Sequence, residues 1–356
     1  MKLVWDLIPN KNSGRNSEGA FIRIPDGRIM FAYGSMVGPT SSDSGACNIV
    51  AIYSSDEGES WTEPVIVAEA AFFGVKNIMS VSTLYQKDGK IGVYFLIKEN
   101  DYTSTIGRAL SEDGISFACE RCELDAPKCY YVINNDRIER FSDGRIVAPA
   151  MASMLNGKKI DHLGIGMCLA SDDDGKTFYP TRPRLTKSVL GEGMEGFQEP
   201  GLFEHADGTI RFWARTPEGY QYECFSRDGM NSFTPPQAAM AFQSPCSPLE
   251  MAKDPTTGDL YVAYNPIAEY PEEVAPCNMK ISWGRTPFVV RRSKDDGRTW
   301  GKLNIVEDDK ERGYCYPAFF FTKDGSMLLA YCRGGESDKS VLARLGMMKI
   351  SLDEIE

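Results

Sequence analysis

Arginines inside apolar, strand-like runs are the residues of this chain whose chemistry is easiest to infer. Arg23 stands within "FIRIP" and Arg215 closes "IRFWAR". An arginine keeps its charge in proteins, so in such a run it needs a carboxylate partner or an anionic ligand. Guanidinium groups bind carboxylates through charge-assisted, often bidentate hydrogen bonds. These residues therefore predict either structural ion pairs or a site for an acidic ligand.

Two other kinds of site lack the residues that they would need. Cys119 and Cys122 form half of a zinc-binding pattern ("CERC"), but no second Cys pair or spaced His pair completes it. His162 and His205 stand near no Ser or Cys motif. We therefore expect neither a Ser/His triad nor a His-rich metal centre.

A short turn motif recurs along the chain and indicates the elements that position these residues. Its complete copies are "SSDEGESW", "SDDDGKTF" and "SKDDGRTW", starting at Ser54, Ser171 and Ser293, and degenerate copies start at Ser111 and Ser226. In each copy the Asp and the Ser or Thr can bond backbone amides of the turn, while the Trp or Phe packs between sheets. The motif is thus predicted to be a folding device, with one copy per repeat.

A second signature alternates with the first: a polar residue, a glycine, then alternating apolar residues. The glycines are Gly27, Gly89, Gly144, Gly208, Gly258 and Gly325. Each supplies the positive φ of a tight hairpin turn, and the run after it is typical of a half-buried strand. Units of about 60 residues with this pattern predict an all-β fold, a six-bladed β-propeller of four-stranded antiparallel sheets. We expect one domain over residues 1–356, with its first and last strands in one blade.

These motifs make the chain similar to the sialidase (neuraminidase) superfamily across essentially its whole length. Beyond the Asp boxes, "FIRIP" matches the family's R-I-P motif, and "QEPGLFEHADGTIRFWAR" matches its E-P dipeptide with a following Arg. Arg285 in "GRTPFVVRRSKDDGRTW" matches the third family Arg, with Arg291 and Arg292 as alternatives. Tyr316 in "YPAFFFTKDG" matches the family Tyr, with Tyr314 as a close rival.

The resemblance implies a role for each matched residue. Arg23, Arg215 and Arg285 would bind the carboxylate of a sialic acid. Tyr316 would be the nucleophile, because a neutral hydroxyl avoids repulsion by that carboxylate. Glu199 would take the tyrosine proton, and Asp43, in the loop before the first Asp box, would protonate the leaving group. The implied activity is that of an exo-α-sialidase, which hydrolyses a glycan substrate with retention of configuration. The reaction requires no metal and no organic cofactor.

One departure from the family pattern bears on the substrate. Many sialidases have a Glu after the Tyr of the last-blade strand to support the first Arg, and this chain has Cys332 there. Several stretches resemble a bacterial branch of sialidase-like glycoside hydrolases, in which Gln221, Tyr222 and Ser247 would line the pocket. Asn135 and Arg137 in "NNDR" are further polar candidates, and each of the five could equally be an ordinary loop or strand residue.

Three alternatives stay open at this point. First, the enzyme would act on another acidic sugar, or would transfer the sugar intramolecularly instead of hydrolysing its bond. Second, the propeller would bind carbohydrate without turnover. Third, a glycosidase would use two catalytic carboxylates, Asp43 and another acid, which would leave the arginines unexplained.

Composition limits the partners and the location. The net charge is −11 and no Lys/Arg run exceeds a pair, which disfavours nucleic acid and anionic membranes as partners. The start, "MKLVWDLIPNKNSGR", lacks the apolar core of a secretion signal, and the ten cysteines are irregularly spaced. We therefore expect a cytoplasmic protein with mostly reduced thiols.

Overall fold

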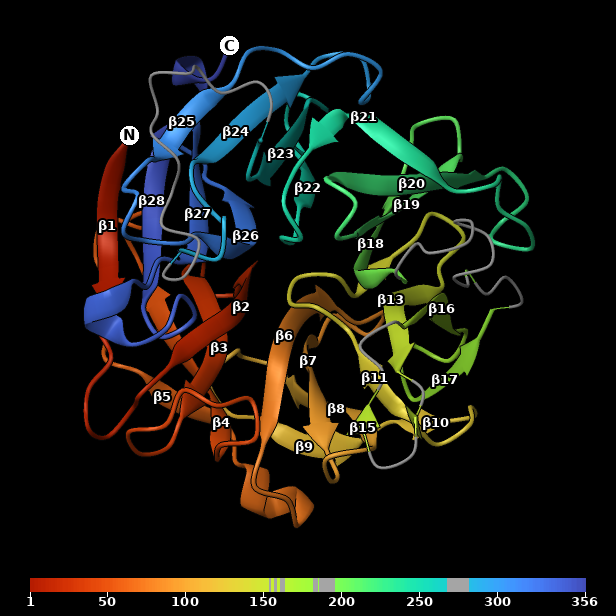
Figure 1. The fold of residues 1–356 in the computed structure, drawn as a ribbon. Coiled ribbons are helices and arrows are strands. Elements are labelled where there is room, and N and C mark those ends of the chain that lie inside the picture. Colours follow the sequence, from red (N-terminus) through yellow and green to blue (C-terminus); the bar gives the residue numbers. More distant parts are fainter. Residues whose placement is uncertain (154, 157–158, 161–163, 182–184, 186–195, 268–281) are drawn as a thin grey trace.

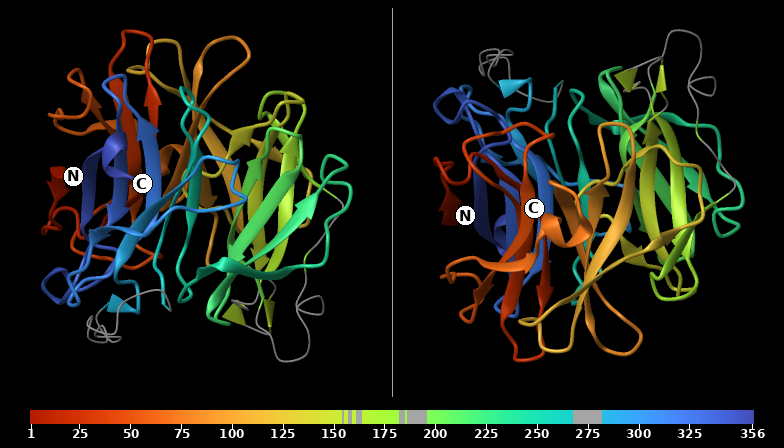
Figure 2. Two further views of the ribbon diagram at one scale, coloured as in Figure 1. Left: turned by 90° about the horizontal axis from the view of Figure 1, so that it is seen from above. Right: turned by 90° about the horizontal axis from the view of Figure 1, so that it is seen from below.

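Antiparallel sheets arranged around a central axis form a six-bladed propeller, and the predicted fold class is confirmed (Figure 1). The two side views show the connecting loops gathered at the two ends of the blades (Figure 2). This computed structural model describes residues 1–153, 155–156, 159–160, 164–181, 185, 196–267 and 282–356. His162 lies outside these residues.

The first two blades are regular four-stranded sheets in chain order. Blade one consists of β2 (Asn16–Arg23), β3 (Ile29–Met36), β4 (Cys47–Ser54) and β5 (Val65–Ala68). Blade two consists of β6 (Ile78–Tyr85), β7 (Ile91–Lys98), β8 (Ser104–Ser111) and β9 (Ala118–Arg121). A short 3-10 turn, η1 (Ala70–Phe73), follows blade one.

The third blade is less regular, because two short strands share its inner edge. β11 (Tyr130–Val132) and β12 (Glu139–Arg140) both pair with β13 (Ile146–Ser153), which continues to β16 (Ile165–Ser171) and β17 (Thr177–Pro180). β10 (Glu123–Leu124) adds a parallel strand to β17, and β14 (Leu155–Asn156) pairs separately with β15 (Lys159–Ile160).

The remaining blades are again four-stranded, and the last one joins the two ends of the chain. Blade four consists of β18 (Gln198–Glu204), β19 (Ile210–Arg215), β20 (Tyr220–Ser226) and β21 (Gln237–Gln243). Blade five consists of β22 (Glu250–Lys253), β23 (Leu260–Tyr264), β24 (Phe288–Ser293) and β25 (Asn304–Glu307). Blade six consists of β26 (Cys315–Phe321), β27 (Ser326–Cys332), β28 (Leu345–Ser351) and β1 (Lys2–Leu7), with 3-10 turns η2 (Glu336–Asp338) and η3 (Leu352–Glu354) near its end.

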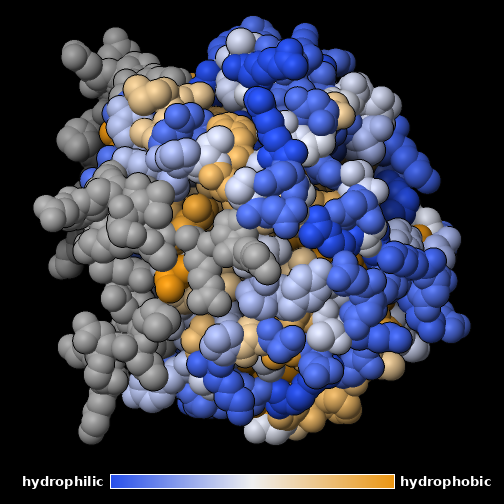
Figure 3. Space-filling view, turned by 90° about the vertical axis from the view of Figure 1, so that its right-hand side faces the viewer, coloured by the Kyte–Doolittle hydropathy of each residue, from blue (hydrophilic) through white to orange (hydrophobic). Residues whose placement is uncertain are grey.

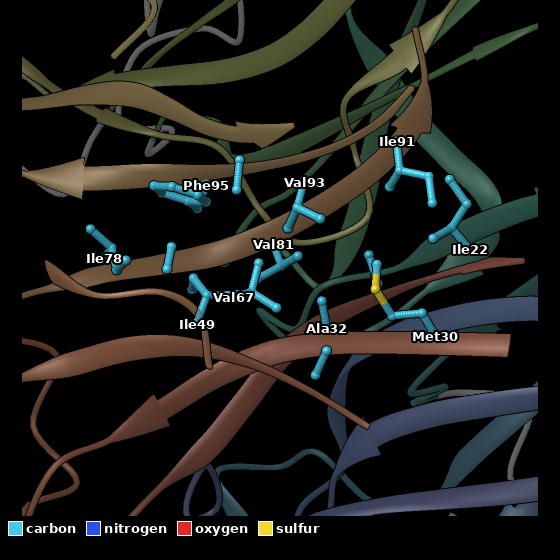
Figure 4. Close-up of a cluster of buried hydrophobic side chains, with 14 of the residues drawn as sticks. Ile22, Met30, Ala32, Ile49, Val67, Ile78, Val81, Ile91, Val93 and Phe95 are labelled. Carbon is cyan, nitrogen blue, oxygen red and sulfur yellow. The ribbon is translucent and has the colours of Figure 1, made fainter. Parts of the chain in front are cut away.

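The cores lie between neighbouring blades. Between blades one and two, Met30, Val81 and Val93 are fully buried and pack in one cluster (Figure 4). The middle strands, such as β3 and β7, are buried almost throughout rather than on alternate residues. The predicted half-buried strands are therefore more buried than expected, because each blade packs against a neighbour on both faces.

The outer surface differs from the cores in its hydropathy. On the side shown in Figure 3 the described residues are mostly hydrophilic. No helix within the described ranges is long and apolar enough to cross a membrane.

The Asp boxes close the turns after the third strands, as their sequence predicts. In the first box, Ser54 Oγ donates to Asp56 (2.8 Å) and accepts from the Gly58 amide (2.8 Å), while Asp56 accepts from the Ser60 amide (2.9 Å). The degenerate copy at Ser226 keeps this pattern, because Met230 adopts the positive φ of 68° that glycine has elsewhere. The Asp boxes therefore stabilise the turns of the fold through hydrogen bonds within each turn.

Candidate active site

The inner strands of four blades carry the same irregularity near their starts. Glu18 on β2, Ser80 on β6, Glu199 on β18 and Tyr316 on β26 have positive φ values of 61°, 61°, 45° and 56°. The pairing of each strand with its neighbour shifts register at this point. Such β-bulges re-aim a side chain and occur next to active sites.

The four bulge side chains line one cavity, at the end of the inner strands opposite the hairpin glycines and Asp boxes. Its volume is about 490 Å³, within the range of about 300–1,000 Å³ for small-molecule sites. Other side chains in its wall include Asp43, Lys98, Tyr130, Arg215, Trp283 and Arg285. The structure thus brings five of the six predicted site residues together.

Tyr316 and Glu199 form the pair at the centre of this cavity. The Tyr316 hydroxyl donates a 2.9 Å hydrogen bond to Glu199 Oε1. Tyr316 is only 8% exposed, and burial is the largest cause that raises the pKa of its hydroxyl, followed by the charge of Glu199. Arg215 and Arg285 act in the opposite direction on this pKa. The phenol is therefore neutral at rest and has a proton acceptor in contact.

Two guanidinium groups flank this pair. Arg215 Nε lies 3.2 Å from Glu199 Oε2, and its Nη1 donates to the Cys246 carbonyl (3.3 Å). Arg285 Nη2 donates to the same carbonyl at 3.5 Å. The Arg285 guanidinium also lies over the rings of Trp283 (5.3 Å) and Tyr316 (5.7 Å). One backbone carbonyl therefore holds both cations side by side in the cavity wall.

A third guanidinium near the site is that of Arg15, which is buried and lies just before β2. Arg15 is 1% exposed, and its Nε donates to Ser17 Oγ at 2.9 Å. Its two terminal nitrogens pair with Asp43 and Glu18. Burial works against the charge, but these two carboxylates outweigh it and raise the pKa of Arg15.

The prediction that Arg23 lies with the other site residues is wrong, because Arg23 does not line the cavity. Arg23 ends β2 while Arg15 precedes it, and at about 3.3 Å per residue an eight-residue strand separates them by about 25 Å. Arg23 instead forms a double hydrogen bond with Glu57 (2.9 and 2.7 Å) and lies over the Phe320 ring. The R-I-P tripeptide thus lies at the end of β2 that is remote from the cavity.

Asp43 lies at the rim of the cavity, on the loop between β3 and β4. Its side chain is 65% exposed and pairs with Arg15, while Lys98 Nζ donates to its backbone carbonyl at 3.1 Å. This placement gives the carboxylate access to solvent and to a group that leaves the cavity. It differs from Glu199, which is enclosed.

Cys332 stands beside Arg15 but brings no carboxylate there. It faces Cys315 across β26 and β27, and both are buried free thiols. Burial raises the pKa of Cys332, and the neighbouring Cys315 raises it further, whereas Arg15 lowers it. Burial opposes ionisation of Cys315 too, but its hydrogen bond with Cys332 and the charge of Arg285, whose Nη1 donates to Cys315 Sγ at 3.1 Å, lower its pKa to about 7.

Two of the further polar candidates join blades instead of lining the cavity. Asn135 Nδ2 donates to the carbonyls of Gly19 (2.9 Å) and Pro317 (3.3 Å). Arg137 forms a buried ion pair with Glu250 at 2.5 Å. Both residues have structural roles near the propeller axis.

Three others lie in blade four or beside it. Gln221 Nε2 donates to Ser244 Oγ and to the Ser247 carbonyl, each at 2.8 Å, and Ser247 Oγ donates to Asn265. Tyr222 packs partly buried against a hydrophobic core. These residues do not line the cavity either.

The rivals for the family positions also lie elsewhere. Arg292 pairs with Asp259, and Arg291 donates to the Gly301 carbonyl at 2.8 Å. Tyr314 is fully buried, and its hydroxyl has no hydrogen-bond partner within the described residues. Tyr316 is therefore the tyrosine of the site.

Glu18 and Ser80 are site residues that sequence reasoning missed. Each stands nine positions before the glycine of its hairpin (18 and 27, 80 and 89), as Glu199 and Tyr316 do (199 and 208, 316 and 325). This shared offset was available in the sequence. Arg15 has no such signal, because it lies in a polar stretch before the strand begins.

The arrangement can bind an anionic group and transfer a proton beside it. The guanidinium groups of Arg215 and Arg285 line the same cavity as a phenol whose hydroxyl donates a 2.9 Å hydrogen bond to a carboxylate. Among the residues with described positions, no group of three or more His, Cys, Asp or Glu side chains could hold a metal ion.

The chain is thus an Asp-box propeller with an arginine-lined cavity at the start of its inner strands, and solved sialidases share this fold. The BNR repeat-like domain family matches residues 27–329, and the chain belongs to that family. No curated protein matches the sequence.

Solved structures share this fold at low identity. A protein of unknown function from Dyadobacter fermentans has a TM-score of 0.71 at 16% identity, covering 98% of this chain and 99% of its own. The NanB sialidase from Streptococcus pneumoniae has a TM-score of 0.71 at 12% identity, over 100% and 71% of the two chains. The intramolecular trans-sialidase from Ruminococcus gnavus has a TM-score of 0.69 at 12% identity, over 97% and 96%.

Proposed function

We propose that the protein is an exo-glycosidase that releases a terminal sialic acid from a glycan with retention of configuration. The observation that carries the proposal is the 2.9 Å hydrogen bond from Tyr316 to Glu199, beside the buried Arg285 and the partly buried Arg215. A protein that only bound an acidic sugar would need the arginines, but it would have no use for an activated phenol. The sialidases among the solved structures with this fold support the same substrate class.

In the first half of the reaction, Arg215 and Arg285 hold the substrate carboxylate. Tyr316 Oη attacks the anomeric carbon while Glu199 takes the phenolic proton. Asp43 donates a proton to the glycosidic oxygen as its bond to the anomeric carbon breaks. A sugar bonded to Tyr316 and a free alcohol result.

The second half reverses these roles. Asp43, now ionised, accepts a proton from water as the water oxygen bonds to the anomeric carbon. The bond to Tyr316 Oη breaks, and Glu199 returns its proton to the phenolate. The products are the free sugar, with its configuration retained, and the regenerated site.

The test is release of a fluorophore from aryl glycosides, led by an α-sialoside, by the wild type and Tyr316→Phe. Phe keeps the ring beneath Arg285 and removes only the nucleophile. We expect turnover of the sialoside and a loss of at least about a thousandfold in kcat in the variant.

The other outcomes decide between the alternatives. Activity on a different acidic sugar alone would replace sialic acid as the substrate. Tight sugar binding without turnover by the folded wild type would make the protein a carbohydrate-binding propeller. A Tyr316→Phe variant with wild-type kcat would exclude the tyrosyl intermediate.

A further inference from the structure

Glu18 is the one acidic bulge residue for which the proposed reaction has no use. Its side chain lines the cavity and is 5% exposed. One of its carboxylate oxygens pairs with Arg15, and the other accepts a 2.6 Å hydrogen bond from Ser80 Oγ. A carboxylate so placed costs desolvation free energy, which its ion pair has to offset.

This carboxylate stands between the cavity and the third arginine. Glu18 lines the cavity, whereas Arg15 does not. The charge of Arg15 is already balanced by Glu18 and Asp43. Consequently a ligand carboxylate meets two guanidinium groups, those of Arg215 and Arg285, and a negative charge where a third would act.

We propose that Glu18 determines the anion affinity of the site by withholding Arg15 from the ligand. While Glu18 is ionised, the ligand carboxylate is held by Arg215 and Arg285 alone. When Glu18 is protonated or replaced, the charge of Arg15 becomes available and anionic ligands bind more tightly. The identity of the ligand rests on the proposed function, but the effect on anions in general does not.

The proposal implies that anion binding depends on pH. Burial is the largest cause that raises the pKa of Glu18, and Arg15 and then Ser80 oppose it. Lowering the pH therefore protonates Glu18 earlier than an ordinary glutamate. The titratable or charged groups around it are Arg15, Asp43, Cys47, Tyr130, Glu199, Tyr316 and Cys332.

A second group in the site also changes its charge with pH. Cys315, beside Arg285, has its pKa lowered to about 7. Its ionisation at higher pH would also weaken anion binding. The part of the pH dependence that belongs to Glu18 is therefore the part that disappears when Glu18 is replaced.

The experiment measures the Kd of inorganic sulfate and of N-acetylneuraminate by calorimetry at constant ionic strength, from pH 5 to pH 8. The proteins are the wild type, Glu18→Gln, Glu18→Ala and Asp101→Asn. Gln keeps the shape and removes the charge, and Ala also opens the path to Arg15. Asp101 lines the exposed rim and hydrogen-bonds Ser44, so its variant removes a charge without touching Arg15.

We expect both Glu18 variants to bind sulfate at least about tenfold more tightly than the wild type at pH 8. Asp101→Asn should change the Kd far less, and the wild type should bind more tightly as the pH falls. If Glu18→Ala fails to fold, Glu18→Gln and the wild-type pH series still decide the matter. Glu18 variants that bind sulfate no better than Asp101→Asn, with an unchanged pH dependence, would overturn the proposal.

The two probes separate this proposal from the proposed function. Tighter sulfate binding by the variants, with no binding of N-acetylneuraminate by any of the proteins, would support the role of Glu18 and contradict sialic acid as the ligand. Tighter binding of both would support both.

Discussion

The Tyr316 hydroxyl reaches Glu199 across the propeller axis, from blade six to blade four, and the two side chains meet at 2.9 Å. Each side chain is turned inward by a bulge at the same position of its strand. The distance between them is therefore fixed by how the blades pack. It does not depend on a flexible loop, and such rigid placement is what a proton transfer requires.

Tyr314→Phe should leave turnover unchanged. The Tyr314 hydroxyl is buried without a hydrogen-bond partner in the described part of the chain, so its removal costs nothing and relieves an unsatisfied group. We expect the wild-type kcat and a Tm equal to or above that of the wild type. A large loss of kcat would move the nucleophile from Tyr316 to Tyr314.

Arg285→Lys should raise KM for a carboxylate-bearing substrate by about tenfold or more, because an ammonium cannot make the paired hydrogen bonds of a guanidinium. The control is the methyl ester of the same glycoside, whose neutral group loses this interaction in both proteins. Steady-state kinetics should therefore show a large difference on the acid and little on the ester. An equal rise in KM on both substrates would mean that Arg285 acts only in packing.

Arg15→Ala should destabilise the protein much more than Arg23→Ala, because only the Arg15 ion pair is buried. Loss of Arg15 leaves the buried Glu18 without its cation, and breaking such a pair costs about 3–5 kcal/mol of unfolding free energy. The Arg23 pair with Glu57 is partly exposed and contributes about 1 kcal/mol or less. Urea unfolding of the two variants measures the difference. Comparable midpoints would contradict the buried role of Arg15.

Acid should weaken the Asp boxes. Hydrogen bonds from the hydroxyls of Ser60, Ser232 and Thr299 are the largest causes that lower the pKa values of Asp56, Asp228 and Asp295, each to about 2. An unfolded Asp titrates near about 3.9, so the unfolded chain binds more protons in this window and stability falls as the pH drops from about 4 to about 2.

The check is the urea midpoint at pH 6, 4 and 3 for the wild type and for a variant with Asn at all three positions. The variant should be less stable at pH 6 and lose less on acidification. An identical acid slope in both proteins would assign the acid sensitivity to other carboxylates.

The features that the sequence predicts well are those set by local chemistry. Box residues bond within a few positions of each other, and a D-G step has few backbone conformations, so blades and turns follow from short stretches. Glu199 and Tyr316 could be found because the short stretches around them match family motifs.

Features that depend on distant partners could not be predicted. Which end of β2 faces the cavity is decided by blade packing, so Arg23 and Arg15 could not be told apart by residue type. Likewise, Cys332 removes an expected carboxylate, and Glu18 supplies one from another blade. Only the three-dimensional arrangement connects these two positions.

The pairing of β1 with β28 has a consequence for how the protein is made. Blade six takes three strands from residues 315–351 and its outer strand from residues 2–7. Residues 2–7 leave the ribosome long before residues 345–351, so the backbone of β1 stays without its partner β28 until late in synthesis. Until then both segments present unpaired edges, and a second nascent chain is able to supply the missing strand. At high expression levels, closure of the ring is thus a step at which two chains would exchange β1 strands and form interlocked dimers. In such a dimer, the blade that carries Tyr316 would consist of strands from both chains.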